Sequence, residues 1–412
     1  MNIQIDVNRI VRELETLAGF SSTPAPAVTR VVFSEEDIRA RAWFYQRCVE
    51  AGLQMREDAV GNTFARWVGS DTDSPAVGTG SHIDAIPNAG RYDGTVGVLG
   101  GLEAIRALQR IGYQPKRSIE LLLFTAEEPT RFGIGCLGSR LLSGTLAPKA
   151  TVAWKDADGR SLDQVRLAAG FSGDLAAVKL PQGYYSAFVE LHIEQGPLLE
   201  QRGVDLGVVT AIAAPASFRI DIYGQGGHAG AVLMTDRHDA FLASAEIALA
   251  LEAAARCTGA VDSVATTGVC QIFPSAINSI PSQVHMEADI RDIDESRRDK
   301  MIAALNDACE RVANGRQVRV TVETINRDAP CASAPAVSEA LERACQKHSF
   351  TFDRMVSRAY HDSLFMSRIS PTAMLFIPCR DGVSHRPDEY ASPEAIGRGA
   401  LVLAETLREL SA

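Results

Sequence analysis

Apolar segments that end in histidine or acidic residues are the feature that most limits what this chain can fold into. Three of them are AVGTGSHID (76–84), SIELLLFTAEE (118–128) and YSAFVELHIE (185–194), and a fourth, TAMLFIPC (372–379), comes shortly before His385. A Gly-rich loop and a helical pattern follow the first segment. Alternating strands, loops and helices are typical of an α/β layer, in which functional side chains gather where the strands end.

Length and composition indicate a globular protein with more than one domain. The chain has 412 residues, of which 46% are hydrophobic and 22% charged, and this predicts one large domain and a smaller one. Its formal net charge is −10, without a Lys/Arg-rich run. Such a chain is a poor nucleic-acid binder, because phosphate contacts supply most of that affinity. No apolar stretch reaches the roughly 20 residues that span a bilayer, so no membrane partner is expected.

The N-terminal sequence and the cysteines indicate the cellular compartment that we expect for the protein. The N-terminus has an amphipathic helical pattern and lacks the apolar block of a secretory leader. The eight cysteines are scattered and form no CxxC pair, which predicts neither a disulfide framework nor a thiolate zinc site. We therefore expect a cytoplasmic enzyme with reduced thiols.

The pattern of the sequence changes near residue 212. From there to about residue 328, the expected elements follow the order strand, helix, strand, strand, helix, strand. This is the split βαβ order of a ferredoxin-like domain. Helix–strand alternation then returns up to the C-terminus. We predict a discontinuous α/β catalytic domain of residues 1–211 and 329–412, with residues 212–328 inserted as a smaller βαββαβ domain.

The segment SHIDAIPNAGRYDG carries the first candidate site residues. His82 ends the apolar strand, Asp84 follows two residues later, and Asp93 lies between Tyr92 and Gly94. Alternation along an extended segment places His82 and Asp84 on the same side, where the Asp84 carboxylate would accept a hydrogen bond from the second ring nitrogen of a metal-bound His82. The alternative is a turn with incidental polar residues.

Two adjacent carboxylates, Glu127 and Glu128, follow the apolar run LLLF. Neighbouring side chains point in different directions, so one can bind a metal while the other faces a bound water. A carboxylate beside a metal-activated water is suited to general-base catalysis. The alternative, a solvated Glu-Glu pair that opens a helix, is disfavoured by the apolar residues that directly precede the pair.

His192 and His385 complete the set of candidate ligands. Together with the first two motifs, they give three histidines and two acidic residues at the ends of predicted strands. Mixed histidine and carboxylate ligands are suited to zinc or manganese. A single catalytic zinc usually has three protein ligands. Five ligands therefore favour two metal ions, roughly 3.5–4 Å apart and bridged by one carboxylate. The set is His82, Asp93, Glu128, His192 and His385.

The predicted inserted domain has a polar cluster of its own. His228 follows two glycines, which allow close approach of the backbone, and Asn278 lies in the segment INSIP. Arg291 offers a planar pair of donors suited to a substrate carboxylate. A tight turn, a loop cap and a surface salt bridge are the alternative interpretations.

These motifs together resemble the metal-dependent aminoacylase/carboxypeptidase superfamily, and within it the hydantoinase/carbamoylase-type amidases. The resemblance covers nearly the whole chain. It implies a mixed-sheet, zinc-peptidase-like catalytic domain with two divalent metal ions per subunit. A histidine at position 192, where peptidases of the superfamily usually have a carboxylate, is typical of the amidases. By this resemblance one metal is held by His82, Asp93 and His192, and the other by Asp93, Glu128 and His385.

The resemblance also implies roles for other residues. Glu127 is the expected general base, and His228 is expected to stabilise the developing oxyanion. The inserted domain corresponds to a lid through which such enzymes form homodimers. Substrate contacts are expected from His228 and from five further residues, namely Gln195, Asn278, Arg291, Tyr360 and His361.

The substrate class follows from the amidase branch, which includes N-carbamoyl-L-amino acid hydrolases, allantoate amidohydrolases and ureidoglycolate amidohydrolases. Segments such as EEPTRFGIGCLGSRLLSG and SRAYHDSLFMSRISP are most similar to the ureidoglycolate enzymes of purine catabolism. The other two groups typically have Gly-His-Asp-Ala where this chain has residues 360–363, Tyr-His-Asp-Ser. We expect hydrolysis of a small carboxylated ureide. A dipeptidase, an aminoacylase and a non-catalytic binding protein remain more distant alternatives.

Overall fold

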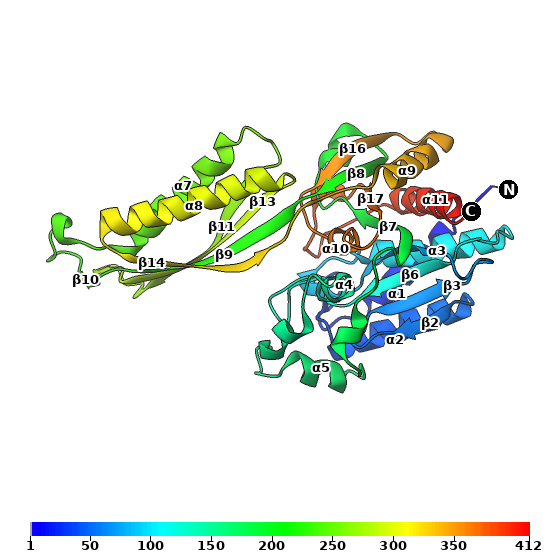
Figure 1. Cartoon of the computed structure of the whole chain (residues 1–412), viewed down its shortest axis with the longest axis horizontal. Coiled ribbons are helices and arrows are strands. Elements are labelled where there is room, and N and C mark those ends of the chain that lie inside the picture. Colours follow the sequence, from blue (N-terminus) through cyan, green and yellow to red (C-terminus); the bar gives the residue numbers. More distant parts are fainter. Residues whose placement is uncertain (1) are drawn as a thin grey trace. The chain divides into compact units, whose positions relative to one another are not determined.

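The computed structural model describes residues 2–412, which divide into two compact units (Figure 1). Unit 1 consists of the segments up to Thr210, Ser333–Met355 and His361–Ala412. Unit 2 consists of Ala211–Ala332 and Val356–Tyr360. The predicted mixed α/β fold is confirmed. No helix in residues 2–412 is long and apolar enough to cross a membrane.

A nine-stranded mixed sheet forms the centre of unit 1, in the order β15-β8-β17-β7-β4-β6-β3-β2, with β16 also paired to β8. Strands β17, β7, β4 and β6 are parallel, β8 runs antiparallel to β15 and β17, and β3 runs antiparallel to β2 and β6. Their bounds are β2 Gln54–Glu57, β3 Thr63–Trp67, β4 Ala76–His82, β6 Ile119–Phe124, β7 Tyr185–Ile193, β8 Leu206–Ile212, β15 Cys331–Ala332, β16 Phe352–Ser357 and β17 Thr372–Ile377.

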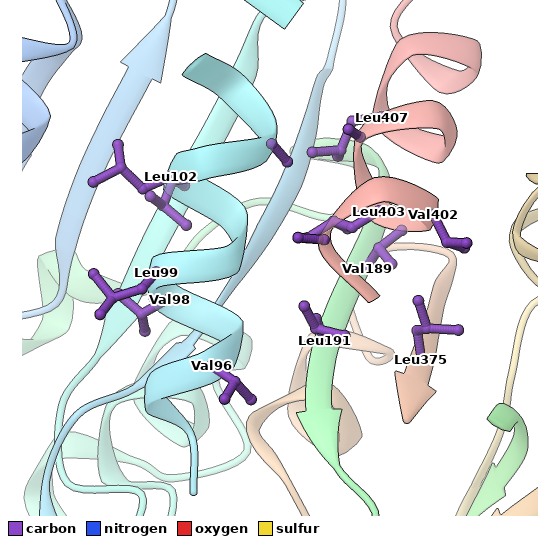
Figure 2. Close-up of a cluster of buried hydrophobic side chains, with 14 of the residues drawn as sticks. Val96, Val98, Leu99, Leu102, Val189, Leu191, Leu375, Val402, Leu403 and Leu407 are labelled. Atoms are coloured by element: carbon purple, nitrogen blue, oxygen red, sulfur yellow. The ribbon is translucent and has the colours of Figure 1, made fainter. Parts of the chain in front are cut away.

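The sheet has a hydrophobic core on each face. Leu121 and Leu123 of β6 belong to one core and Leu122 and Phe124 to the other, because successive residues of a strand point to opposite faces. On the first face, side chains of β7 and β17 pack with those of α3 and α11 (Figure 2). The helices that contribute to this core are α1 Val7–Ala18, α2 Glu35–Glu50, α3 Thr95–Arg110, α9 Pro335–Lys347 and α11 Pro393–Leu410.

Shorter elements complete unit 1. Helices α4 and α5 contribute to the second core, and β1 and β5 form a separate two-stranded sheet. The bounds of the short strands and helices are β1 Val28–Arg30, β5 Ala85–Ala89, α4 Leu137–Ser143, α5 Leu162–Ala168, α6 Leu198–Arg202 and α10 Asp362–Met366. The 3-10 helices are η1 Pro148–Ala153, η2 Leu175–Val178 and η4 Arg380–Gly382.

Unit 2 contains an antiparallel sheet of four strands in the order β11-β13-β9-β14, and two long helices pack against it (Figure 1). Burial alternates strictly along β13, as expected for a sheet with one covered face. The long elements follow the order strand, helix, strand, strand, helix, strand. Their bounds are β9 Ala214–Tyr223, α7 Ala240–Cys257, β11 Val264–Phe273, β13 Gln283–Asp292, α8 Glu295–Arg316 and β14 Arg319–Arg327, and the short elements are β10 Gly227–His228, η3 Met234–Asp236 and β12 Ser279–Ile280.

Candidate metal centre

Four of the five predicted ligands lie at the carboxyl ends of the central parallel strands, and the fifth, Asp93, lies just before a helix. His82 is the last residue of β4, and His192 is the last but one of β7. Glu128 follows β6, and His385 follows β17. Asp93 precedes α3, whose N-cap is Gly94. Parallel strands end at the same edge of a sheet, so residues that are far apart in the sequence come together there.

The ligand atoms form two groups that share Asp93. Oδ1 of Asp93 lies 3.4 Å from Nε2 of His82 and 3.2 Å from Nε2 of His192. Nε2 of His385 lies 3.4 Å from Oδ2 of Asp93 and 3.1 Å from Oε1 of Glu128. Within each group the ligand atoms lie within 4.8 Å of one another. Asp93 therefore offers one carboxylate oxygen to each group, as a bridging carboxylate would.

Burial and hydrogen bonding of the histidines fit a metal ion. Nε2 of His82 is buried and has no hydrogen-bond partner among residues 2–412. A Cβ at Gly94 would lie 2.4 Å from this nitrogen, so glycine leaves the space in front of it open. Nδ1 of His82 and Nδ1 of His192 contact main-chain carbonyls at 3.0 and 2.9 Å. These contacts place the ring protons on Nδ1 and leave both Nε2 atoms unprotonated, as a metal ligand requires. Nε2 of His192 accepts the main-chain N–H of Gly94 at 3.1 Å.

The side chain of Asp84 has a different role from the one predicted. The main-chain oxygen of Asp84, not its carboxylate, contacts Nδ1 of His82 at 3.0 Å, and the nearer carboxylate oxygen lies 3.7 Å away. The carboxylate instead accepts the main-chain N–H groups of Glu127 at 3.2 Å and Glu128 at 3.0 Å. It thus holds the turn that carries both glutamates. In this turn Ala126 has a positive φ of 55°, an unfavourable conformation that is common at functional sites.

Glu127 lies beside the first group of ligand atoms. Its Oε2 is 3.7 Å from Nε2 of His82, and the thiol of Cys136 lies 3.5 Å from its Oε1. Burial and, among nearby carboxylates, Glu128 raise the pKa of Glu127 well above its ordinary value. A raised pKa makes the carboxylate a better proton acceptor, as a general base requires.

The mutual interactions of the candidate ligands shift their pKa values, so that protons are bound at the site that a metal ion would occupy. Hydrogen bonds with Asp93 and Glu128 raise the pKa of His385 to about 11. Burial alone would raise the pKa of Asp93, but the surrounding histidines lower it well below the ordinary value. A divalent ion would replace these protons and neutralise the carboxylates, so metal binding is expected to release protons.

Gln195 and His361 both lie next to the ligand groups. Nε2 of Gln195 donates to Oδ2 of Asp93 at 2.6 Å, and Gln195 has a positive φ of 56°. The buried ring of His361 lies 4.5 Å from that of His192, centre to centre. His361, His192 and Glu190 also form a group that could hold a metal. The buried ring of His361 thus packs against the ring of the candidate ligand His192.

Several buried polar residues near the centre were not predicted. Glu190 accepts hydrogen bonds from Ser81 at 2.8 Å and from the hydroxyl of Ser363 at 2.6 Å. Burial raises the pKa of Asp362 to about 8. Glu389 is buried near Asp93. A glutamate inside the apolar strand β7 was the signal that could have identified Glu190. No comparable signal marked Glu389, because its partners are distant in sequence.

Unit 2 carries the remaining predicted residues, including Tyr360 at the end of its second segment. His228 of β10 pairs with Ser279 of β12, and the main-chain N–H of Ala229 donates to the carbonyl of Asn278 at 2.9 Å. His228 and Asn278 are therefore neighbours, and both are exposed. Arg291 donates to Asp289 at 2.6 Å and to the main chain of Arg358 at 3.2 Å, which shows that its guanidinium is already oriented.

Comparison with known proteins gives a consistent result. A model of peptidase family M20/M25/M40 matches residues 78–409. A ureidoglycolate hydrolase of Arabidopsis thaliana is 48% identical, with 100% of this chain and 88% of that protein aligned. An N-carbamoyl-L-amino acid amidohydrolase of Geobacillus stearothermophilus is 37% identical, with 99% of each chain aligned.

A solved structure supports the same grouping. The crystal structure of AtUAH in complex with glyoxylate has a TM-score of 0.90 and 48% identity, and the match covers 100% of this chain and 99% of that one. The resemblance to hydantoinase/carbamoylase-type amidases that was predicted from the sequence is confirmed. The chain belongs to peptidase family M20/M25/M40.

Proposed function

We propose that this protein hydrolyses the ureido C–N bond of a small carboxylated ureide, most specifically ureidoglycolate, to give glyoxylate, ammonia and carbon dioxide. The observation that carries the proposal is the pair of ligand groups sharing Asp93, with Glu127 beside them. Full-length similarity at 48% identity to a plant ureidoglycolate hydrolase supports the choice of substrate.

The proposed centre takes two divalent ions, zinc or manganese. His82, Asp93 and His192 would hold one, and Asp93, Glu128 and His385 the other. When bound, such ions polarise a carbonyl and lower the pKa of an attacking water. The chain's own contribution is a fixed geometry, since the main-chain carbonyls of Asp84 and Ile193 hold the rings of His82 and His192.

Glu127 is the proposed general base. Its carboxylate would take a proton from the attacking water and then deliver it to the leaving nitrogen as the C–N bond breaks. Asp84 acts as a positioning residue in this scheme, because its carboxylate holds the main chain of both Glu127 and Glu128. The buried position of Glu127, 8% exposed, limits the access of bulk water to the proton.

The remaining residues would bind the substrate. Arg291, oriented by Asp289, is suited to a carboxylate through a bidentate pair of N–H donors. His228 would donate to the developing oxyanion, with Asn278 beside it. Gln195 and His361, which lie beside the metal ligands, and Tyr360 of unit 2 are also proposed to contact the substrate.

Unit 2 is proposed to act as the dimerisation and lid domain, corresponding to the predicted insertion 212–328. Strand β11 lies at an edge of its sheet, and exposed edges are sites where a second chain can pair. The neighbouring helix α7 exposes Leu249 at 65% and Phe241 at 39%. Leu249→Asp should therefore shift the protein from dimer to monomer in sedimentation, whereas Leu167→Asp, at an exposed leucine of unit 1, should not. A wild-type monomer would contradict the proposal.

A panel of ureides tests the substrate. The metal-loaded enzyme is given ureidoglycolate, allantoate, an N-carbamoyl-L-amino acid and a dipeptide, and ammonia and glyoxylate are measured separately. We expect ammonia and glyoxylate from ureidoglycolate at the highest kcat/KM. Absence of glyoxylate from ureidoglycolate would refute the preferred substrate, and preference for a carbamoyl amino acid or allantoate would select the alternative ureide. Hydrolysis of the dipeptide alone would refute the amidase assignment.

A further inference from the structure

Glu389 links the two loops that carry Asp93 and His385. Its side chain is buried, and Oε1 accepts the main-chain N–H of Tyr92 at 2.7 Å and that of Asp93 at 3.2 Å. Its Oε2 lies 3.0 Å from the hydroxyl of Ser384, the residue directly before His385. One carboxyl group therefore contacts the loop after β5 and the loop after β17, almost 300 residues apart in the sequence.

The hydroxyl of Ser384 extends this link to the proposed bridging ligand. Ser384 Oγ lies 2.6 Å from Oδ2 of Asp93 and 3.0 Å from Oε2 of Glu389. A hydroxyl has a single proton to donate, and the shorter contact assigns that proton to Asp93. Asp93 is thus held through its main chain by Glu389 and through its side chain by Ser384 and Gln195.

Gly90 shows how closely Glu389 packs against the Asp93 loop. A Cβ at Gly90 would lie 2.3 Å from Cβ of Glu389 and 2.4 Å from its Oε1. Such distances are not possible between real atoms, so only glycine admits the carboxyl group at this position. The close approach places Oε1 within reach of two consecutive main-chain N–H groups.

We propose that Glu389 is a positioning residue that sets the geometry of the metal centre. It fixes the distance between the Asp93 loop and the His385 loop, and so presents both oxygens of Asp93 to their respective ligand groups. The inference rests on the metal ligands named in the proposed function. It concerns their geometry and not the substrate.

Two substitutions separate geometry from charge. Glu389→Ala removes all three contacts. Glu389→Gln keeps an oxygen that can accept the N–H groups of Tyr92 and Asp93, and its amide can donate to Ser384 Oγ while the hydroxyl still donates to Asp93. A matched control is Asp205→Ala, since Asp205 also joins two loops by accepting the main-chain N–H and the hydroxyl of Thr351, each at 2.9 Å.

The experiment measures metal binding by each full-length variant, with zinc and manganese titrated into chelator-treated protein against a chromophoric competitor. The visible spectrum of the cobalt-substituted protein reports ligand geometry. We expect Glu389→Ala to bind metal about 10–100-fold more weakly, as is typical when a residue that orients metal ligands is lost. Its cobalt spectrum should change as well. Glu389→Gln should bind within a few-fold of wild type, and Asp205→Ala should match wild type in both measurements.

Three results would overturn the inference. They are wild-type affinity and spectrum in Glu389→Ala, equal losses in Glu389→Gln and Glu389→Ala, and an equal loss in Asp205→Ala. Thermal unfolding of each metal-free variant shows whether that variant folds. If Glu389→Ala does not fold, the cobalt spectrum of Glu389→Gln decides: a spectrum like that of wild type is expected, and a changed spectrum would overturn the inference. If wild type binds no metal, the proposed centre itself fails. If wild type binds metal but hydrolyses no ureide, only the proposed substrate fails.

Discussion

The two units differ in how they hold their candidate functional residues. In unit 1, four of the five candidate ligands are at most 9% exposed, and His385 is the exposed one. In unit 2, His228 and Asn278 are exposed and Arg291 is half-buried. Unit 1 therefore carries a preformed set of charged groups. The free-energy cost of removing these groups from water is offset by their contacts with one another. The residues of unit 2 are solvated and suited to meet a ligand.

This difference agrees with the separate roles proposed for the two units, metal binding in unit 1 and substrate contact in unit 2. Buried and oriented ligands favour tight metal binding, because little reorganisation is needed when the ion enters. The exposed His228 and Asn278 keep their conformational freedom until a ligand binds, whereas Arg291 is held by Asp289. Exposed donors of this kind suit the lid role proposed for unit 2. Four predictions test whether the two units have separate roles, and the one with the largest expected effect comes first.

Glu127→Gln should lower kcat by at least ~10²–10⁴-fold, because the amide cannot accept the proton from water. Metal content, measured by elemental analysis, should stay the same, since Glu127 belongs to neither ligand group. The matched change Glu128→Gln should reduce metal content instead. Substantial activity in Glu127→Gln would show that another group is the base.

His228→Ala should lower kcat by ~10²–10³-fold through the loss of an oxyanion donor. The metal affinity should not change, because the residue is exposed and lies in unit 2. His238→Ala serves as the control, since the Nδ1 of His238 contacts the main-chain oxygen of Arg316 within the same unit. Loss of metal from His228→Ala would contradict the division between the units.

Metal removal should destabilise unit 1 and leave unit 2 largely unaffected. An ion that binds only the folded state at 1,000 times its Kd contributes about 4 kcal/mol. Hydrogen exchange with and without a chelator should therefore show faster exchange in β4, β6 and β7 and little change in α7 and α8. Equal changes in both units would indicate that the two unfold together.

The smallest effect concerns acid stability in unit 2. Burial would raise the pKa of Asp292, but hydrogen bonds from Arg297 and Ser263 outweigh this and lower it. A carboxylate with a lowered pKa in the folded state stabilises that state above its unfolded pKa of about 3.9, and this contribution disappears as the pH falls through the folded pKa. Asp292→Asn should therefore melt below wild type at pH 6, and the gap should narrow toward pH 3. A gap independent of pH would exclude this cause.

Local patterns in the sequence were sufficient for the main features of the fold. The apolar runs that became β4, β6, β7 and β17 are continuous because parallel strands are buried on both faces. The element order in unit 2 followed from the same periodicities. The positions of the candidate ligands at strand ends were equally visible, because such ends carry chemistry in α/β proteins.

Details of orientation and long-range contact were not predictable. The Asp84 motif indicated a hydrogen bond to His82, but the direction of a carboxylate depends on which turn packs beside it, here the one that carries Glu127 and Glu128. Glu389 follows a proline-containing turn and gave no local signal. Its contacts join loops almost 300 residues apart.

The sequence by itself determined the type of chemistry, since residue type and position along a strand fix which side chains are available and at which edge of the sheet they lie. The family resemblance implied that two groups of ligands share Asp93, but only the tertiary structure decided which of its oxygens faces each group and which residues hold it there. The physical reason is range: periodicity acts over neighbouring residues, whereas the position of each oxygen of Asp93 depends on Gln195, Ser384 and Glu389, which only the folded sheet brings together.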